Sequence, residues 1–432
     1  MEYIICSLLF QSKVIYVVYY RRFGDGIVIK KVKYEEVFYS LLILFVAVLI
    51  LSESQFNELG AIGATLKIIK FAIIAAIALF SITRNRSVKR DLFVSSFILI
   101  SALVFNLIFN DGGMSIIPLI MVVWASKNYS IEKTFRYTFI TILVTYMFVF
   151  ACSILGVLKD NVQFVIRGIE AGSFFAGEYN RHSYGFLVHN QIAIAFFILY
   201  MFYIAIRRDK IRWYESLIVM MLNLLILRFF GSRIIFILTV LACIGYYIER
   251  GIQKYSKKNK ASKAFILAFP VCCALSLIIC INYNYSSMFY RALDLLFSNR
   301  VRLSNEAISS YGIHLLGAGQ YAGTYNSTVL SNNTVDNGYI SFIIQNGLIA
   351  GVMIIGVWTY ITYIAVKNHN RFLMLTLTMI AIENIVNPHL GSYLLVPFFS
   401  VFVNIKDSFV TNKEVANVFG FKRMKRKHSQ KN

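Results

Sequence analysis

Arginine residues beside polar turns are the first residues of this sequence whose type and position suggest chemistry. Arg300 and Arg302 begin an amphipathic stretch, and Arg233 follows a Gly-Ser pair at the start of an apolar run. A guanidinium group binds phosphate oxygens through paired N–H donors and keeps its charge at any physiological pH. The sequence therefore predicts anion binding at Arg300 and Arg302, and the alternative is that these two side chains only extend to lipid headgroups. At Arg233 a charge facing lipid would be costly, so this side chain is predicted to face a wet interior cavity.

Another cationic position precedes a different apolar run. Arg181 and His182 come directly before this run, and His189 and Asn190 lie just inside it. Polar side chains within a membrane span usually hydrogen-bond a neighbouring helix, which is the simpler interpretation of His189. For Arg181, substrate binding stays open as the other interpretation.

Acid–base chemistry has a candidate in Asp336, which together with Asn337 precedes an apolar run. A carboxylate at the mouth of a cavity can accept a proton from a sugar hydroxyl. Asp and Asn are also common caps of a following helix, so both interpretations stay open. An acid inside a membrane span normally has a function. Further candidates for proton acceptors or buried polar sites are His314, His389, Glu383 and Asn384.

Cofactor chemistry is not expected. The stretch from Gly317 to Ala322 nearly fits a dinucleotide-binding fingerprint, but that motif requires a preceding strand and a helix-like segment precedes it here. The six cysteines lack the spacing of metal ligands and lie mostly in or beside apolar runs, where cysteine packs as a small apolar residue. We expect no metal, no cofactor and no disulfide.

The elements that must position these residues are strongly apolar. The chain is 58% hydrophobic and has a mean hydropathy of +0.65, whereas soluble domains are about 45–50% apolar. Lipid as the solvent explains this excess. The net charge of +22 comes from basic residues that flank the apolar runs without forming a stripe, so nucleic acid is not expected as a partner. The N-terminus shows no cleavable signal sequence.

About 12 apolar runs predict transmembrane helices, because backbone groups in lipid must be paired within their own segment. The predicted fold class is an all-α polytopic membrane protein. The predicted spans are 35–52, 63–82, 91–109, 112–126, 136–157, 184–206, 213–229, 232–249, 264–282, 338–363, 371–387 and 391–405. The predicted parts are a cytoplasmic lead (1–34), one transmembrane domain (35–405) and a basic cytoplasmic tail (406–432).

Charge predicts the orientation of these spans. Every second connector is rich in Lys and Arg, and together with the lead and the tail these connectors hold about 33 of the 43 basic residues. Positive loops stay inside, so both termini are predicted to be cytoplasmic. The outside segments are then about 158–184 and a large loop, 283–337, between the ninth and tenth spans. Apolar residues at helical spacing in the large loop predict two amphipathic helices lying against the membrane.

Four features carry a resemblance to a known family. The features are the twelve-helix layout with one large late outside loop, Gly231-Ser232-Arg233 at the start of a span, Ser298-Asn299-Arg300 followed after a helix by Leu315-Leu316-Gly317-Ala318-Gly319, and Asp336-Asn337-Gly338-Tyr339 leading to Asn346-Gly347-Leu348-Ile349-Ala350-Gly351. Over about residues 35–405 the chain resembles the Wzy-type polysaccharide repeat-unit polymerases, which are related to O-antigen ligases.

The resemblance implies a reaction at the outer face of the bacterial cytoplasmic membrane. A growing glycan on polyprenyl diphosphate would be transferred to the non-reducing end of a lipid-linked repeat unit. Arg300 would stabilise the leaving diphosphate without a metal, and Asp336 would activate the acceptor hydroxyl where related ligases have a His. The implied substrate-binding residues are Arg233, Arg302, Arg181, Asn337 and His314.

The implied partners are polyprenyl-diphosphate-linked oligosaccharides and membrane lipids, together with a flippase and a chain-length regulator. Two other functions stay open: a flippase or exporter of lipid-linked oligosaccharide, and an O-antigen-type ligase. A transporter usually concentrates polar residues at mid-membrane, often on paired half-helices. This sequence places most of its polar residues toward the outer face instead, which favours the polymerase.

Overall fold

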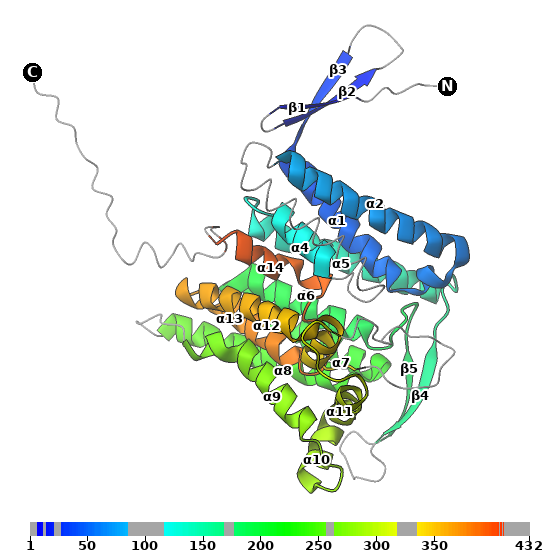
Figure 1. Cartoon of the computed structure of the whole chain (residues 1–432), viewed down its shortest axis with the longest axis vertical. Coiled ribbons are helices and arrows are strands. Elements are labelled where there is room, and N and C mark those ends of the chain that lie inside the picture. Colours follow the sequence, from blue (N-terminus) through cyan, green and yellow to red (C-terminus); the bar gives the residue numbers. More distant parts are fainter. Residues whose placement is uncertain are drawn as a thin grey trace, which may run out of the picture.

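Helices form the body of the molecule, and two small antiparallel sheets lie beside it (Figure 1). The computed structural model of the protein describes residues 7–11, 14–20, 27–84, 116–167, 177–255, 263–317 and 335–405, together with Asp407 and Phe409. The α-helices are α1 (Tyr34–Ser52), α2 (Gly60–Arg84), α4 (Ile116–Ala125), α5 (Ile131–Ile154), α6 (Gln191–Arg207), α7 (Trp213–Phe230), α8 (Arg233–Tyr255), α9 (Ala268–Ile281), α10 (Met288–Leu296), α11 (Arg300–Tyr311), α12 (Gly338–Lys367), α13 (Arg371–Glu383) and α14 (Val396–Val403). Short 3-10 turns are η1 (Gln55–Glu58), η3 (Arg208–Lys210), η4 (Lys263–Leu267) and η5 (Tyr393–Leu395).

Eight of the described helical segments are long and apolar enough to cross a membrane. They contain α1, α2, α5, α6, α7, α8, α9 preceded by η4, and α12. The predicted fourth, eleventh and twelfth spans correspond to α4, α13 and α14, which have 10, 13 and 8 residues and are shorter than the ~20 residues of a full crossing. The predicted third span, 91–109, lies outside the described residues. The prediction of a largely helical protein with several apolar helices long enough to cross a membrane is confirmed.

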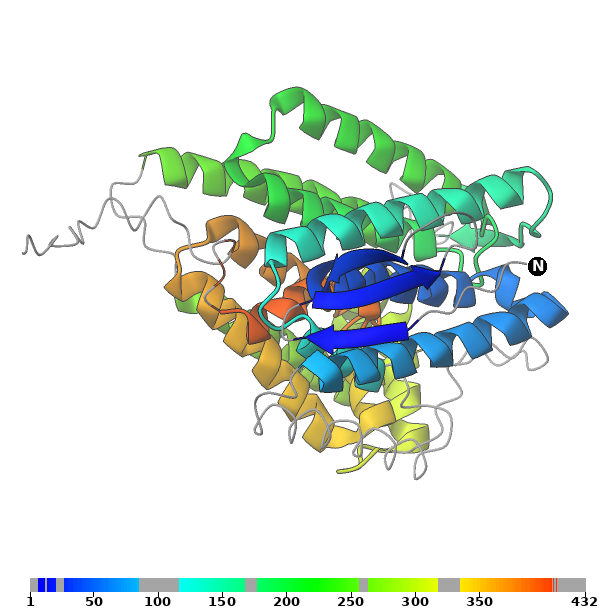
Figure 2. The same cartoon turned by 90° about the horizontal axis from the view of Figure 1, so that it is seen from above.

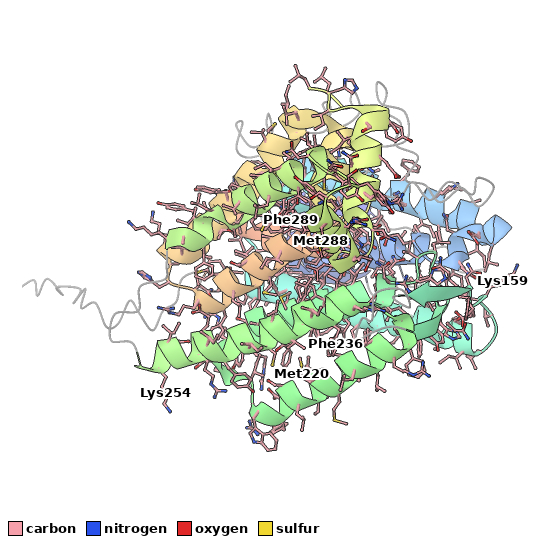
Figure 3. All side chains as sticks on the ribbon, turned by 90° about the horizontal axis from the view of Figure 1, so that it is seen from below. Lys159, Met220, Phe236, Lys254, Met288 and Phe289 are labelled. Carbon is pink, nitrogen blue, oxygen red and sulfur yellow. The ribbon has the colours of Figure 1, made fainter. Side chains whose placement is uncertain are left out.

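The surface of α7 shows the polarity of a helix that faces lipid. Its large apolar side chains, such as Leu217 and Met221, are more than half exposed, whereas Asn223 is fully buried. The Asn223 amide donates to the carbonyl oxygen of Phe236 on α8, 3.1 Å away; Figure 3 shows the two helices side by side. A polar residue on a lipid-facing helix finds its partner on a neighbouring helix, as expected where water is absent.

Interactions between helix ends define two ends of the bundle. At one end, the buried Arg371 at the start of α13 pairs with Glu249 near the end of α8, 2.9 Å away. At the same end, Lys133 at the start of α5 pairs with Glu35 at the start of α1, 2.7 Å away. We call this end the Arg371 end; the described basic connectors between α4 and α5, α6 and α7, and α12 and α13 lie there. The opposite end, where α1 and α13 end and α12 begins, is called the Asp336 end.

Two sheets were not predicted from the sequence. Strands β1 (Ser7–Gln11), β2 (Val14–Tyr20) and β3 (Ile27–Lys33) form an antiparallel sheet in which β2 is central. Figure 1 shows this sheet outside the helical body, and Figure 2 shows it in front of the helices when the molecule is seen from above. Strands β4 (Val162–Arg167) and β5 (Gly177–His182) form a hairpin between α5 and α6. The runs of 5 to 7 residues in β1–β3 are too short to span lipid. Strands β2 and β3 are also rich in Val, Ile or Tyr, which favour strands. The fold is therefore not purely α-helical.

Helix α12 is broken at Gly347, whose φ of 88° and ψ of 163° lie outside the helical region. The amides of Leu348 and Ile349 donate instead to the carbonyl oxygens of His314 and Leu315, at 2.9 and 3.2 Å. A Cβ on Gly347 would lie 2.4 Å from the Leu315 oxygen. Glycine is therefore required, because the segment after α11 packs directly against the backbone of α12. Two motifs of the sequence resemblance meet here.

Candidate functional site

The candidate site is built around Arg300, the first residue of α11. Its Nε lies 3.1 Å from Oδ2 of Asp336, which directly precedes the α12 cap, and the two side chains are 13% and 35% exposed. Its Nη1 donates to the carbonyl oxygen of Val386 and, at 3.2 Å, to Oδ1 of Asn387. One guanidinium group therefore connects α11 in the large loop (283–337) with the residue before α12 and with the segment 384–392 after α13.

Asn337 has a structural position in this arrangement. Its Oδ1 accepts hydrogen bonds from the amides of Tyr339 and Ile340, at 3.1 and 3.2 Å, and so caps α12. The following Gly338 donates its amide to the carbonyl oxygen of Asn384, 2.8 Å away. A Cβ on Gly338 would lie 2.5 Å from the Asn387 oxygen, so glycine allows the start of α12 to approach the end of α13. Of the two adjacent polar residues, Asn337 caps the helix and Asp336 binds Arg300.

A second charged pair lies on the same segment. Nδ1 of His389 is 3.0 Å from Oε1 of Glu383, the last residue of α13, and the Glu383 side chain is 2% exposed. Burial lowers the pKa of His389, but the attraction of the Glu383 carboxylate and its hydrogen bond outweigh burial and raise that pKa above its ordinary value. The charges of Glu53 and Arg300 also act on His389. The two pairs thus form one electrostatic cluster.

Glu53, directly after α1, extends this cluster toward α6. Its Oε2 accepts hydrogen bonds from the Tyr393 hydroxyl, at 2.8 Å, and from Nε2 of Gln191, at 2.6 Å. Burial raises the pKa of Glu53, although these hydrogen bonds and the charges of His389 and Lys70 oppose the effect. We call Arg300, Asp336, Asn387, Glu383, His389, Glu53, Gln191 and Tyr393 the polar cluster. Its residues come from six elements or their ends, α1, α6, α11, α12, α13 and η5, so only the folded bundle assembles it.

The hairpin β4–β5 brings Arg181 to the α7–α8 turn. Arg181 Nε donates to the carbonyl oxygen of Phe230, the last residue of α7, at 3.0 Å. Its side chain passes Gly231, whose φ is 60°, and α8 begins at Arg233. The predicted candidates Arg181 and Arg233 are therefore neighbours in the fold, and part of the Arg181 guanidinium group caps a helix C-terminus.

Asp160 fixes the base of this hairpin. Its Oδ2 lies 2.5 Å from Nδ1 of His182, and its Oδ1 accepts from the amides of Ser183 and Tyr184, each at 2.9 Å. Burial raises the pKa of Asp160, but the hydrogen bonds from His182 and the two amides outweigh it and leave the pKa below its ordinary value. The sequence interpretation did not single out this carboxylate.

Two predicted site residues are held elsewhere. Arg302 pairs with Glu306 one turn along α11, at 2.7 Å, and both side chains are more than 40% exposed. The exposed His314 lies 2.8 Å, through its Nε2, from the Tyr311 carbonyl oxygen. No contact within the described part of the chain joins either residue to the polar cluster.

Three members of the polar cluster were not identified from the sequence: Glu53, Gln191 and Tyr393. A polar residue at the end of an apolar run looks like an ordinary helix boundary.

The polar cluster offers a cation for anion binding and side chains that can take up a proton, among them Asp336 and His389. Across the described ranges, no three His, Cys, Asp or Glu side chains gather as metal ligands would. No family model matches the chain, and neither curated proteins nor solved structures match it significantly. The function is therefore inferred from the side chains themselves.

Proposed function

We propose that the protein polymerises polyprenyl-diphosphate-linked oligosaccharide repeat units into a capsular or O-antigen-like surface polysaccharide. One observation carries the proposal. The Arg300–Asp336 pair, together with the hydrogen bond from Arg300 to Asn387, connects α11 with the start of α12 and the end of α13. This contact unites two of the motifs on which the family resemblance rests. It also creates a cationic position next to proton acceptors, which a transfer from a diphosphate requires.

Arg300 is the group proposed to hold the leaving diphosphate. Its Nε and Nη1 have protein partners, whereas no residue in the described ranges accepts from Nη2. Guanidinium–phosphate hydrogen bonds are charge-assisted, so a diphosphate oxygen at Nη2 would gain a strong interaction without displacing Asp336. Negative charge grows on the diphosphate as its bond to the sugar breaks, and this donor stabilises that charge.

The membrane is the proposed surrounding of the prenyl chains. Helix α10 exposes Met288 and Phe289, at 82% and 64%, while Asp294 on its other face is buried; Figure 3 shows Met288 and Phe289 on the surface of α10. A helix with this inverted polarity suits the boundary between headgroups and acyl chains. The proposed orientation puts both termini in the cytoplasm and the Asp336 end at the outer face, because the described basic connectors gather at the Arg371 end.

The test uses purified protein and lipid-linked oligosaccharide extracted from source cells that lack this protein. Wild-type protein should convert it into a ladder of polymers. R300A should make no ladder, because the leaving diphosphate loses its cation. The matched control is R136A, which removes an Arg from the exposed Arg136–Glu132 pair at the Arg371 end and should leave the ladder intact. A normal ladder from R300A would contradict the assignment.

A flippase or exporter is the second candidate, favoured by one observation. Helix α12 is interrupted at Gly347, and interrupted helices are common at the substrate sites of transporters. Proteoliposomes distinguish the functions: movement of the lipid-linked oligosaccharide without a ladder supports the flippase. Single transfer of a finished glycan to a different acceptor supports the ligase.

A further inference from the structure

We infer that His389, oriented by Glu383, is the proton acceptor of the transfer reaction, and that Asp336 is a positioning residue that holds Arg300. This inference rests on the proposed function and names a catalytic group for it. It separates the two candidate acceptors in the polar cluster by their hydrogen bonds.

The hydrogen bond from Glu383 selects one nitrogen of His389. A carboxylate accepts from Nδ1–H, so the lone pair of the neutral ring is on Nε2. No described residue binds Nε2, whereas Nδ1 lies 3.0 Å from Glu383. Pro388 precedes His389, and the His389 amide donates to the Asn387 carbonyl oxygen at 3.0 Å. The ring is therefore held by its own side-chain bond and by a constrained backbone.

The position of Glu383 is costly for a residue that only supports the fold. Its side chain is 2% exposed, and it is the last residue of α13, where the helix dipole disfavours negative charge. A buried carboxylate is retained where its charge has a use, and here it faces a single histidine. A glutamine could hydrogen-bond the ring without carrying that charge. The carboxylate therefore indicates that the proton affinity of His389 matters.

Two buried side-chain amide atoms near the Glu383–His389 pair lack hydrogen-bond partners among the described residues. Nδ2 of Asn387 and Oδ1 of Asn384 have no hydrogen-bond partner in the described part of the chain, and the two residues are 1% and 0% exposed. Buried polar atoms are normally satisfied, so a free donor and a free acceptor on one segment suit a hydroxyl-bearing ligand. The sugar hydroxyls of the acceptor have this chemistry. The residues lie within five positions of His389, on the segment that also binds Arg300.

Asp336 is less suited to take the proton. Its Oδ2 accepts from Arg300 Nε, so protonating this carboxylate would weaken the ion pair at the moment when Arg300 must hold the leaving diphosphate. Its negative charge instead keeps Arg300 in place. Proton uptake by His389 leaves that pair intact.

The step balances as a displacement. The acceptor hydroxyl oxygen forms a bond to the anomeric carbon of the donor glycan, and its proton passes to Nε2 of His389. The bond from the anomeric carbon to the diphosphate oxygen breaks, and its electron pair leaves with the polyprenyl diphosphate. His389 then releases the proton to water, and the next acceptor binds.

The pH dependence follows from the groups that face His389. These are Glu383 from α13, Glu53 from the end of α1, and Arg300 from α11. Glu383 and Glu53 raise the pKa of His389, while burial and Arg300 lower it, and the balance is a raised pKa. Only the neutral ring accepts a proton, so the transfer rate should rise with pH, and the midpoint of this rise should lie above the ordinary histidine pKa of ~6.5. Removing the Glu383 charge should move this rising limb of the pH–rate profile to lower pH.

The experiment compares full-length wild type, H389Q, E383Q and D336N in detergent, with lipid-linked oligosaccharide extracted from source cells that lack this protein. H389Q should lower the transfer rate by about 10²–10⁴-fold, the range for loss of a general base, and should retain binding of the lipid-linked donor. E383Q should shift the limb of the pH profile downward, whereas D336N should lower the rate without moving that limb. The matched control is H369N. His369 lies at the Arg371 end, and its backbone φ of 53° is one that asparagine tolerates.

The outcomes separate this inference from the proposed function. A wild-type protein that makes no ladder overturns both. A wild-type ladder together with a normal rate and pH profile for H389Q overturns the inference and leaves the polymerase standing. The inference also fails if D336N moves the limb and E383Q does not. Thermal melting of each variant identifies unfolded protein, and the E383Q pH profile keeps the test decisive if H389Q does not fold.

Discussion

At the scale of single residues, the most deeply buried Arg–Glu pair of this bundle joins partners far apart in the sequence. Arg371 and Glu249 have side chains only 7% and 9% exposed, and their charged atoms lie 2.9 Å apart. Burying two charges is costly, and the pair offsets that cost only while both members are present. This pair lies at the Arg371 end, away from the polar cluster, and so gives a stability test that does not involve the proposed reaction.

E249A should destabilise the protein strongly. It leaves the Arg371 guanidinium buried without its carboxylate, which typically costs about 3–5 kcal/mol. The matched control is E132A, which breaks the exposed Arg136–Glu132 pair and should leave the stability almost unchanged, because water screens such pairs. Thermal unfolding in detergent measures both. Equal melting temperatures for the two variants would contradict the structural assignment of the buried pair.

The sequence identified several members of the polar cluster but not their partners. Arg300 and Asp336 stood out because each charge is next to a polar turn, and Glu383 because it interrupts an apolar run. Their pairing depends on how α11 packs against the start of α12 and the end of α13, which no local sequence pattern encodes. Arg302, with the same charge as Arg300, is rotated away on α11 and pairs with Glu306. Two residues of one type within a single helical turn cannot be separated by composition.

At the scale of elements, the break in α12 depends on glycine. Gly347 combines a φ of 88° with a ψ of 163°, a conformation that is essentially limited to glycine and costs other residues about 1–3 kcal/mol. An added Cβ would also lie 2.4 Å from a backbone oxygen, whereas nothing lies within 4 Å of a Cβ added at Gly356 on the same helix.

G347A should therefore lower the thermal stability in detergent markedly, and G356A should leave it unchanged or raise it slightly through better helix propensity. The ladder assay should follow the same order, because the 312–317 segment is joined to the end of α11, and its displacement disturbs the helix that carries Arg300. A G347A protein as stable as G356A would show that α12 can continue straight through this position.

Most apolar helices could be predicted from the sequence, whereas the interruptions and the strands could not. Hydropathy marks a run such as α12 as one span, and it does not record that the amides of Leu348 and Ile349 find acceptors on another segment. The hairpin β4–β5 lies in a region whose polar residues suggested only a loop. Strand pairing there depends on the register between Val162 and His182, which alternation in two short runs does not fix.

At the scale of the whole molecule, orientation in the membrane is the central prediction. Lys159 beside the β4–β5 hairpin and Lys254 near the end of α8 are both exposed and lie at opposite ends of the bundle (Figure 3). In a background without the six native cysteines, K159C should react with a membrane-impermeant maleimide on intact spheroplasts. K254C should react only after permeabilisation. Reversed labelling would place the Asp336 end in the cytoplasm and exclude an extracytoplasmic transfer reaction.

The hydrogen bonds that Leu348 and Ile349 make to His314 and Leu315 have a consequence for biogenesis. Within a bilayer, two amides without acceptors would cost several kcal/mol, so α12 reaches its bent form only once the 312–317 stretch is in position. That stretch is synthesised first, so its carbonyl groups are ready when the ribosome delivers α12. A chimera that replaces the insert with one from another protein would therefore have to reproduce these acceptors, or its tenth predicted span would emerge from the translocon without a stable partner.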